Sequence, residues 1–261
     1  MTDQHKHDSE EQEQAATTCD AKARNKPHKG VYLLPNLFTT GALFSGFYAV
    51  VAAMGGRFEA AAIAIFVAMV LDGLDGRVAR MTNTQSPFGA EYDSLSDMVS
   101  FGVAPALVAF TWALGDLGKL GWFAAFLYVA GTALRLARFN TQIGSVDKRY
   151  FIGLPSPAAA AAVAGLIWVC TAFAIDPDDI VYLVALYVAL AGVLMVSNVL
   201  YYSFKDVDFR DKVPFIILAA IVLVIAVISI SPPLFLWVLF VVYACSGPVL
   251  WLLRRKRHLA K

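Results

Sequence analysis

Long apolar stretches separated by short polar segments make up most of this chain of 261 residues. A helix that crosses a lipid bilayer needs about 20 consecutive apolar residues, and eight stretches come close to that length. They run roughly over Val31–Ala53, Phe58–Ala79, Met98–Leu114, Leu120–Phe139, Pro157–Ile175, Ile180–Phe204, Val213–Ile230 and Pro233–Leu253. The pattern predicts an all-α fold, a polytopic integral membrane helix bundle with about eight transmembrane helices.

The composition supports this prediction. Hydrophobic residues make up 59% of the chain and charged residues 16%, whereas soluble proteins contain roughly 45–50% and 25%. Eight spans leave about 100 residues for tails and connections, which excludes a separate soluble domain of ordinary size. We therefore expect residues 31–253 to form one transmembrane domain. Residues 1–30 are polar and predict a disordered cytoplasmic tail, and residues 254–261 predict a basic cytoplasmic tail.

Basic residues are distributed unequally between the two sets of connections. Only Arg57 and Lys119 of the 21 Lys and Arg residues lie in one set, and all the others lie in the two tails and the opposite connections. Lys and Arg are retained on the cytoplasmic side of a membrane. An even number of spans also places both ends of the chain on one side, so we expect both termini in the cytoplasm.

Four aspartates lie where two apolar stretches meet. Asp72 and Asp75 stand near the end of the second stretch, and Asp93 and Asp97 stand at the start of the third. Residues three or four apart share one face of a helix, and a short turn joins the two segments. A carboxylate in or beside the bilayer is costly and is therefore a functional candidate. The spacing predicts that the four carboxylates converge just beneath the cytoplasmic surface, where lipid headgroups meet their acyl chains.

Such an acidic cluster requires positive charge to neutralise it. All four histidines lie in the tails, at His5, His7, His28 and His258. The candidate ligands are therefore oxygens, which hard divalent cations such as Mg²⁺ and Mn²⁺ prefer. Two such ions about 3.5–4 Å apart would suit phosphoryl chemistry. Two other interpretations stay open: the acids could pair with Arg77 and Arg80, or they could line a path for protons or cations.

The segment around these acids resembles the signature of a known enzyme family. It reads Asp-Gly-Leu-Asp-Gly-Arg-Val-Ala-Arg, then eight residues, then Gly-xxx-Asp-xxx-Asp. The CDP-alcohol phosphotransferase family carries DxxDGxxAR, eight residues, GxxxDxxxD. All the signature positions match, at Asp72, Asp75, Gly76, Ala79, Arg80, Gly89, Asp93 and Asp97. The resemblance implies an integral membrane enzyme that displaces CMP from a CDP-linked substrate with an alcohol.

The resemblance also implies a role for each matched side chain. Asp72, Asp75 and Asp93 would bind two metal ions, and Asp97 would be the general base with an added contact to metal. The CDP group would be held by Asp72 together with Gly76, Ala79 and Arg80. Asn36, at the opening of the first span, is a further candidate for the nucleotide site, although it could equally cap a broken helix.

Three shorter strings resemble the subgroup of this family that uses CDP-diacylglycerol and L-serine. They are Leu34-Pro35-Asn36, Arg135-Leu-Ala-Arg138-Phe-Asn140 and Phe151-Ile-Gly-Leu-Pro155-Ser-Pro157. The resemblance implies transfer of a phosphatidyl group to serine at the cytoplasmic face of a bacterial inner membrane. It is compatible with a homodimer, and we expect no nucleic-acid partner. The same chemistry with glycerol 3-phosphate, inositol phosphate or choline is the nearest alternative, and a carboxylate-lined cation or proton transporter is the alternative from another class.

Serine would bring a carboxylate into the site, and a planar guanidinium is well suited to bind it. Arg135 and Arg138 close the fourth span on the cytoplasmic side, and Asn140 follows just beyond. These three residues are the candidates for binding the acceptor. The alternative is that basic residues at cytoplasmic helix ends set the topology and attract anionic lipid headgroups.

Overall fold

The computed structural model describes residues 33–82, 84–141, 150–202, 222–224, 226 and 228–259. In chain order its elements are α2 (Leu33–Met54), α3 (Phe58–Met81), α4 (Pro87–Asp97), the π-helix η1 (Met98–Val103), α5 (Ala104–Trp112), the 3₁₀-helix η2 (Leu114–Leu117), α6 (Lys119–Thr141), β1 (Tyr150–Ile152), α7 (Ser156–Ala172), α8 (Pro177–Val196), β2 (Leu200–Tyr202) and α10 (Pro232–Leu259). The described part of the chain is thus almost entirely helical.

Five described helical segments are long and apolar enough to cross a membrane. They are Leu34–Met54, Pro87–Trp112, Lys119–Thr141, Pro177–Val196 and Pro232–Leu253. The prediction of a helical, polytopic membrane protein is confirmed at this level. α3 is also long, but any 18 consecutive residues of it contain at least three charged side chains, and α7 has only 17 residues. The number of spans stays a prediction, because the expected span Val213–Ile230 and the tail 1–30 lie largely or wholly outside the described residues.

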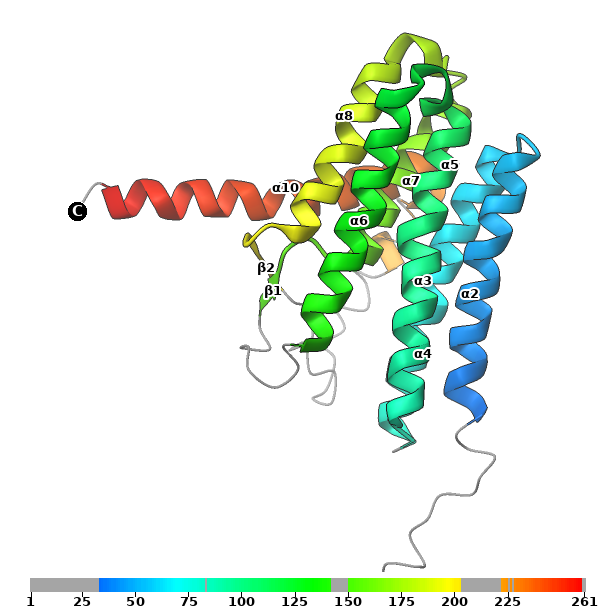
Figure 1. Cartoon of the computed structure of the whole chain (residues 1–261), viewed down its shortest axis with the longest axis vertical. Helices are drawn as coiled ribbons and strands as arrows, with labels where there is room; N and C mark the ends of the chain where they lie inside the picture. Colours follow the sequence, from blue (N-terminus) through cyan, green and yellow to red (C-terminus); the bar gives the residue numbers. More distant parts are fainter. Residues whose placement is uncertain are drawn as a thin grey trace, which may run out of the picture.

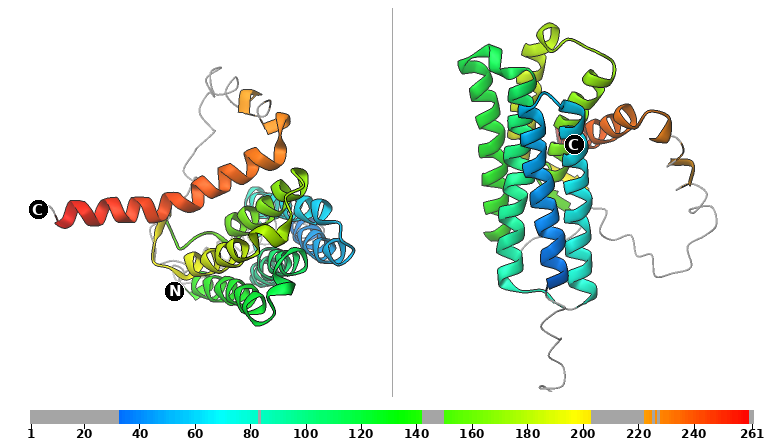
Figure 2. Two further views of the ribbon diagram at one scale, coloured as in Figure 1. Left: turned by 90° about the horizontal axis from the view of Figure 1, so that it is seen from above. Right: turned by 90° about the vertical axis from the view of Figure 1, so that its right-hand side faces the viewer.

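The long helices stand side by side in a bundle, and one helix runs across it. α2 and α3 form an extensive antiparallel pair, and α6 pairs with α8. α10 crosses the bundle, packs mainly against α7, and projects beyond the other helices at its C-terminal end (Figures 1 and 2). α10 continues to Leu259, past the expected end at Leu253.

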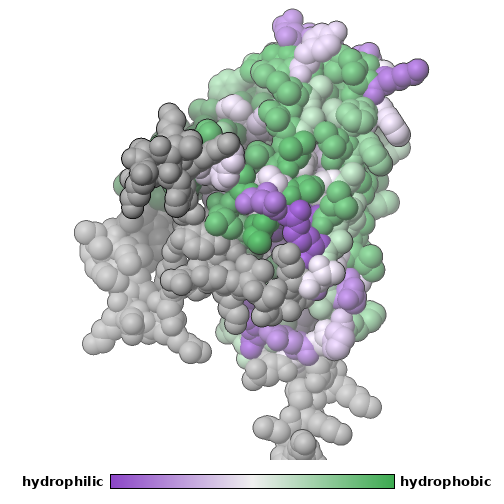
Figure 3. Space-filling model, turned by 60° about the vertical axis from the view of Figure 1, so that its left-hand side comes forward, coloured by the Kyte–Doolittle hydropathy of each residue, from purple (hydrophilic) through white to green (hydrophobic). Residues whose placement is uncertain are grey.

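Small residues allow the helices to approach closely inside the bundle, while large apolar side chains cover the outside. Residues 158–162, all alanines, are buried on α7. Where α6 crosses α8, a Cβ placed on Gly131 would lie only 2.5 Å from the backbone oxygen of Gly192. On the outside, side chains such as Phe44 and Leu183 are exposed, and apolar surface covers much of the face in Figure 3. This distribution is expected of a protein surrounded by lipid.

The third predicted span differs from the structure in where it begins. α4, η1 and α5 follow one another without a break over residues 87–112, so Asp93 and Asp97 lie well inside a long helical segment. The helix begins early because the Ser86 hydroxyl accepts a hydrogen bond from the Gly89 backbone N–H at 3.0 Å, and Pro87 occupies the first turn. Both features favour helix initiation. The wider π-turn follows immediately after Asp97.

A short antiparallel strand pair interrupts the otherwise helical fold, and the sequence pattern did not indicate it. β1 pairs with β2, with Phe151 opposite Tyr201. Gly153 follows β1 at φ +80, and a Cβ there would lie 2.2 Å from the backbone oxygen of Met195. Only glycine fits this position without strain. Gly153 and Leu154, which donate backbone hydrogen bonds to Val199 and Leu194, are thereby held against the end of α8, just before Ser156 begins α7.

Candidate active site

The acidic segment forms a helical hairpin with the four aspartates on its facing sides. Asp72 and Asp75 lie near the C-terminal end of α3, and Asp93 and Asp97 lie on α4. One carboxylate oxygen each from Asp72, Asp75 and Asp93 lies within 4.8 Å of the other two. Asp72 lies close to Asp93 and Asp97, and Asp75 lies close to Asp93. The structure therefore brings together all four aspartates that the sequence indicated.

The chemistry of this cluster fits divalent metal ions. Asp75 is buried, with 5% of its surface exposed, and Asp93 and Asp72 are half-buried. The Oδ1 atom of Asp93 is itself buried and has no hydrogen-bond partner among the described residues. A buried carboxylate oxygen without a partner is costly, and like charges this close repel one another. Hard cations with a preference for oxygen would remove both costs.

Arg77 and Arg80 do not neutralise the acids through the contacts that the structure describes. Both side chains are exposed. Asp75 accepts a hydrogen bond from Thr39 instead, and the acids lie mainly against one another. The interpretation of the cluster as ordinary ion pairs at a helix end therefore gains no support from these contacts.

The matched glycines leave space or allow close approach beside the acids. A Cβ on Gly76 would meet no atom within 4 Å among the described residues, so room for a ligand remains next to Asp72 and Asp75. A Cβ on Gly89 would lie 3.1 Å from the hydroxyl oxygen of Ser86 and 3.6 Å from Oδ1 of Asn36. Gly89 thus lets Asn36 on α2 lie close to the start of α4. Ala79 is half-buried one turn beyond Asp75.

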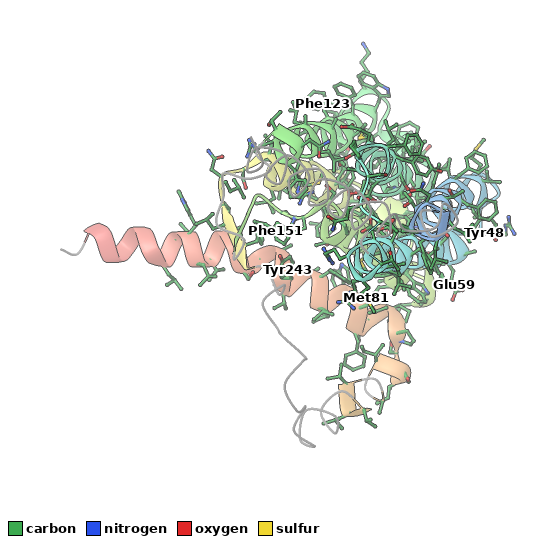
Figure 4. All side chains as sticks on the ribbon, turned by 90° about the horizontal axis from the view of Figure 1, so that it is seen from below. Tyr48, Glu59, Met81, Phe123, Phe151 and Tyr243 are labelled. Atoms are coloured by element: carbon green, nitrogen blue, oxygen red, sulfur yellow. The ribbon has the colours of Figure 1, made fainter. Side chains whose placement is uncertain are left out.

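Arg135 lies beside the acidic cluster near the C-terminal end of α6. Its side chain is buried, with 9% exposed, and one terminal nitrogen donates a 2.8 Å hydrogen bond to the hydroxyl of Ser156. Its Nε is buried without a hydrogen-bond partner in the described part of the chain. The electrostatic neighbours of the guanidinium are Asp97 and Tyr243 of α10, and Figure 4 marks Tyr243 on the part of α10 that lies against the bundle.

Arg138 and Asn140, the other two acceptor candidates, have contacts that join helices. Arg138 donates to the backbone oxygen of Val196 at 2.9 Å and to Oδ1 of Asn198 at 3.3 Å, so it caps the C-terminal end of α8. Asn140 is exposed and donates to the hydroxyl of Ser94 at 3.1 Å. Because Ser94 directly follows Asp93, Asn140 connects α6 to the helix that carries two of the acids. Their roles toward an acceptor stay predictions.

The structure also brings residues to the site that the sequence did not single out. Thr39 on α2 bonds to Asp75, and it could have been noticed because it lies one helical turn after Asn36. Ser156 stands within a string already marked by the resemblance. Tyr243 is more than a hundred residues from Arg135 along the chain, and no spacing signal connects the two.

The comparisons with known proteins agree with this geometry. The family model described as CDP-alcohol phosphatidyltransferase matches residues 32–201, which include every candidate site residue. A CDP-diacylglycerol--serine O-phosphatidyltransferase of Helicobacter pylori is 37% identical over 226 residues, covering 87% of this chain and 94% of the relative. Proteins with the same name are 33% identical in Mycobacterium tuberculosis (92% of this chain, 85% of the relative) and 36% identical in Methanocaldococcus jannaschii (70% and 80%). The extent of these matches shows that the chain belongs to the CDP-alcohol phosphatidyltransferase family.

Proposed function

We propose that this chain is a metal-dependent enzyme that transfers the phosphatidyl group of CDP-diacylglycerol to the hydroxyl of L-serine, giving phosphatidylserine and CMP. The observation that carries the proposal is the convergence of Asp72, Asp75, Asp93 and Asp97 in a chain of this family. The choice of serine rests on relatives of that activity that match the chain over most of its length.

The acidic cluster is the proposed metal site. Asp72, Asp75 and Asp93, whose carboxylate oxygens lie together, are the proposed metal ligands, and Asp97, a neighbour of Asp72, is proposed to contact the metal as well. Two ions of Mg²⁺ or Mn²⁺, when bound, would supply the positive charge that neutralises a diphosphate and makes CMP a better leaving group. Asn36, Gly76, Ala79 and Arg80 are the proposed contacts of the CDP group, and the open space at Gly76 supports that assignment.

Asp97 is the proposed general base. It takes the proton of the serine hydroxyl, the serine oxygen forms a bond to the phosphorus next to diacylglycerol, and the bond from that phosphorus to the CMP oxygen breaks. Base catalysis of this kind contributes about 10²–10⁴-fold. A single displacement needs no covalent enzyme intermediate, and the sequence has no histidine between residues 29 and 257 to carry one.

Arg135 is the proposed binding partner of the serine carboxylate. Asp97 is an electrostatic neighbour of its guanidinium, and the proposal is that one acceptor molecule contacts both residues. The buried Nε has no partner in the described ranges. This supports the role, because an ionised donor without a partner is costly and a carboxylate would satisfy it. Arg138 and Asn140 complete the proposed acceptor end of the site.

The proposed topology has eight spans, with residues 31–253 as the catalytic domain and both tails in the cytoplasm of a bacterial cell. The start of α2, the turn between α3 and α4, and the end of α6 lie at one end of the bundle (Figure 1). Arg77, Arg80, Arg135 and Arg138 gather at that end, whereas Arg57 and Lys119 belong to the opposite connections. The active site would thus face the cytoplasm at the inner membrane.

A homodimer is the proposed assembly, and crosslinking in native membranes tests it.

An acceptor panel tests the function directly. Purified protein in detergent is incubated with CDP-diacylglycerol and Mn²⁺ or Mg²⁺, and CMP release is measured with L-serine, glycerol 3-phosphate, inositol phosphate or choline. We expect release with serine, and the D97N variant (Asp97→Asn) controls for contaminating activity. If serine releases no more CMP than buffer does, the serine assignment is wrong. A transporter would instead give cation flux in vesicles without CDP-lipid and no release of CMP.

A further inference from the structure

Thr39 on α2 makes direct contact with the acidic cluster. Its hydroxyl oxygen lies 2.7 Å from Oδ2 of Asp75 and 3.1 Å from the backbone oxygen of Pro35. A threonine hydroxyl has one proton to donate. The carboxylate is the nearer and more strongly charged acceptor, so the proton is directed to Asp75. Both side chains are buried, with 4% of Thr39 and 5% of Asp75 exposed.

The backbone at Thr39 is held as well. The hydroxyl of Ser96 on α4 donates to the backbone oxygen of Thr39 at 3.1 Å. The Ser100 hydroxyl donates to the backbone oxygen of Ala42 at 3.0 Å, one turn along α2. Gly46 lies one further turn along α2. A Cβ there would lie 2.6 Å from the Ser100 hydroxyl oxygen. α2 is therefore packed closely against the segment that carries Asp93 and Asp97.

These contacts make Thr39 a connection between the two halves of the acidic hairpin. Its side chain bonds to Asp75 of α3, and its backbone accepts a bond from α4. One oxygen of Asp75 is thus occupied by a donor from α2, which restricts rotation of the carboxyl group. Hydrogen bonds from a neighbouring side chain to a ligating carboxylate orient it, and their loss typically costs about 10–100-fold in metal affinity or activity.

We propose that Thr39 is a positioning residue of the metal centre, which sets the orientation of the Asp75 carboxylate through the bond from its hydroxyl. This inference rests on the proposed function, because it takes Asp75 to be a metal ligand. In this proposal Thr39 acts through Asp75 and is not itself a metal ligand. The hydrogen bond from Thr39 restricts rotation of the Asp75 carboxyl group before metal binds. Less rotational freedom of Asp75 is therefore lost when metal binds.

Direct measurement of Mn²⁺ binding tests the proposal without relying on turnover. The purified full-length protein is stripped of metal, and free Mn²⁺ is titrated by electron paramagnetic resonance in the absence of nucleotide. Thr39→Val removes the hydroxyl at nearly constant volume, and Thr39→Ser keeps it. We expect Thr39→Val to raise the Kd for Mn²⁺ about tenfold or more, and Thr39→Ser to stay within about threefold of the unmodified protein.

Two controls separate positioning from general packing. Thr40→Val is the same change at the next residue, whose hydroxyl lies near Tyr92 and Asn36 rather than a carboxylate. Ser100→Ala deletes a buried bond between the same two helical segments whose acceptor is a backbone oxygen rather than a carboxylate. Both variants are expected to bind Mn²⁺ like the unmodified protein, and thermal unfolding in detergent confirms that each variant is folded.

The outcomes distinguish this inference from the function on which it rests. Unchanged Mn²⁺ affinity in Thr39→Val would overturn the positioning role while leaving the metal site intact. An equal loss of affinity in Ser100→Ala would also overturn it, because packing alone would then explain the effect. Absence of Mn²⁺ binding in the unmodified protein would overturn the proposed metal chemistry itself.

Discussion

The guanidinium of Arg135 and the hydroxyl of Ser156 form a buried 2.8 Å hydrogen bond that joins the end of α6 to the first residue of α7. The bond fixes one side of the planar group. Its Nε is buried and has no partner among the described residues, and Asp97 is an electrostatic neighbour of the guanidinium.

Arg135→Lys should weaken serine binding selectively. Lysine keeps the charge but loses the planar fork that binds a carboxylate through two donors. A hydrogen bond to a charged group is worth about 1.5–3 kcal/mol, so we expect the KM for serine to rise about 10–100-fold. The KM for CDP-diacylglycerol, measured in the same preparations, should change much less. Equal increases in both values would place Arg135 outside the acceptor site.

Asp97→Asn should abolish most turnover while leaving the lipid substrate bound. The amide cannot accept the serine proton, so we expect kcat to fall about 10²–10⁴-fold. The variant should still bind CDP-diacylglycerol, since Asp72, Asp75 and Asp93 keep their carboxylates. Steady-state CMP release and a direct binding measurement check the two parts. Near-normal kcat would remove Asp97 from its role as base.

Asp75→Ala should affect metal dependence and nucleotide binding together. The substitution removes a carboxylate from the cluster that also contains Asp93, whose Oδ1 has no hydrogen-bond partner among the described residues. We expect the Mn²⁺ concentration for half-maximal activity to rise by about tenfold or more, in line with the loss of a group that orients or binds metal. A metal titration curve that matches that of the unmodified protein would argue against Asp75 as a ligand.

Gly76→Ala should fold normally but bind CDP-diacylglycerol less well. A Cβ at Gly76 meets nothing within 4 Å among the described residues, and the same holds at Gly73 on the same helix. Alanine favours a helix interior by roughly 0.5–1 kcal/mol over glycine, so neither variant should lose stability. Only Gly76→Ala should raise the KM for CDP-diacylglycerol, because only Gly76 is placed at the nucleotide. Gly73→Ala is the matched control, and equal kinetics in the two variants would contradict the assignment.

Gly131→Ala should destabilise the bundle without a specific effect on either substrate. Its Cβ would lie 2.5 Å from the backbone oxygen of Gly192, which cannot move without separating α6 from α8. Overpacking of this kind costs typically 1–3 kcal/mol. A lower unfolding temperature in detergent, with unchanged KM values in the protein that remains folded, is the expected result. An unchanged unfolding temperature would mean that the helices separate more easily than their packing suggests.

Much of the site followed from local sequence. The three-residue and four-residue spacings of Asp72, Asp75, Asp93 and Asp97 place them on helix faces whatever else the chain does, because the period of a helix is constant. The short connection at Ser86 then requires the two helices to lie side by side. Convergence was therefore predictable, and Gly76 and Gly89 could be identified from the same signature.

Contacts between distant segments were not predictable in the same way. Arg138 was selected for its charge, but the structure gives it the backbone oxygen of Val196 and the side chain of Asn198 as partners. Thr39 carried no charge and no motif, yet it bonds to Asp75. Such partners depend on how helices rotate and slide against one another, which hydrophobic periodicity does not specify when nearly every face is apolar.

The sequence by itself determined that the chain is helical, that it belongs in a membrane, and that four carboxylates meet near one end of a hairpin, because apolar length and helical period are local properties. The tertiary structure decided which side chains surround those carboxylates. It placed Thr39 against Asp75, left Arg135 beside Asp97, and held the start of α7 with a strand pair that no apolar pattern indicated. Such arrangements are set by how the helices pack, as at Gly131 and Gly153, where backbones approach so closely that a Cβ would meet the neighbouring chain, and local sequence does not specify that packing.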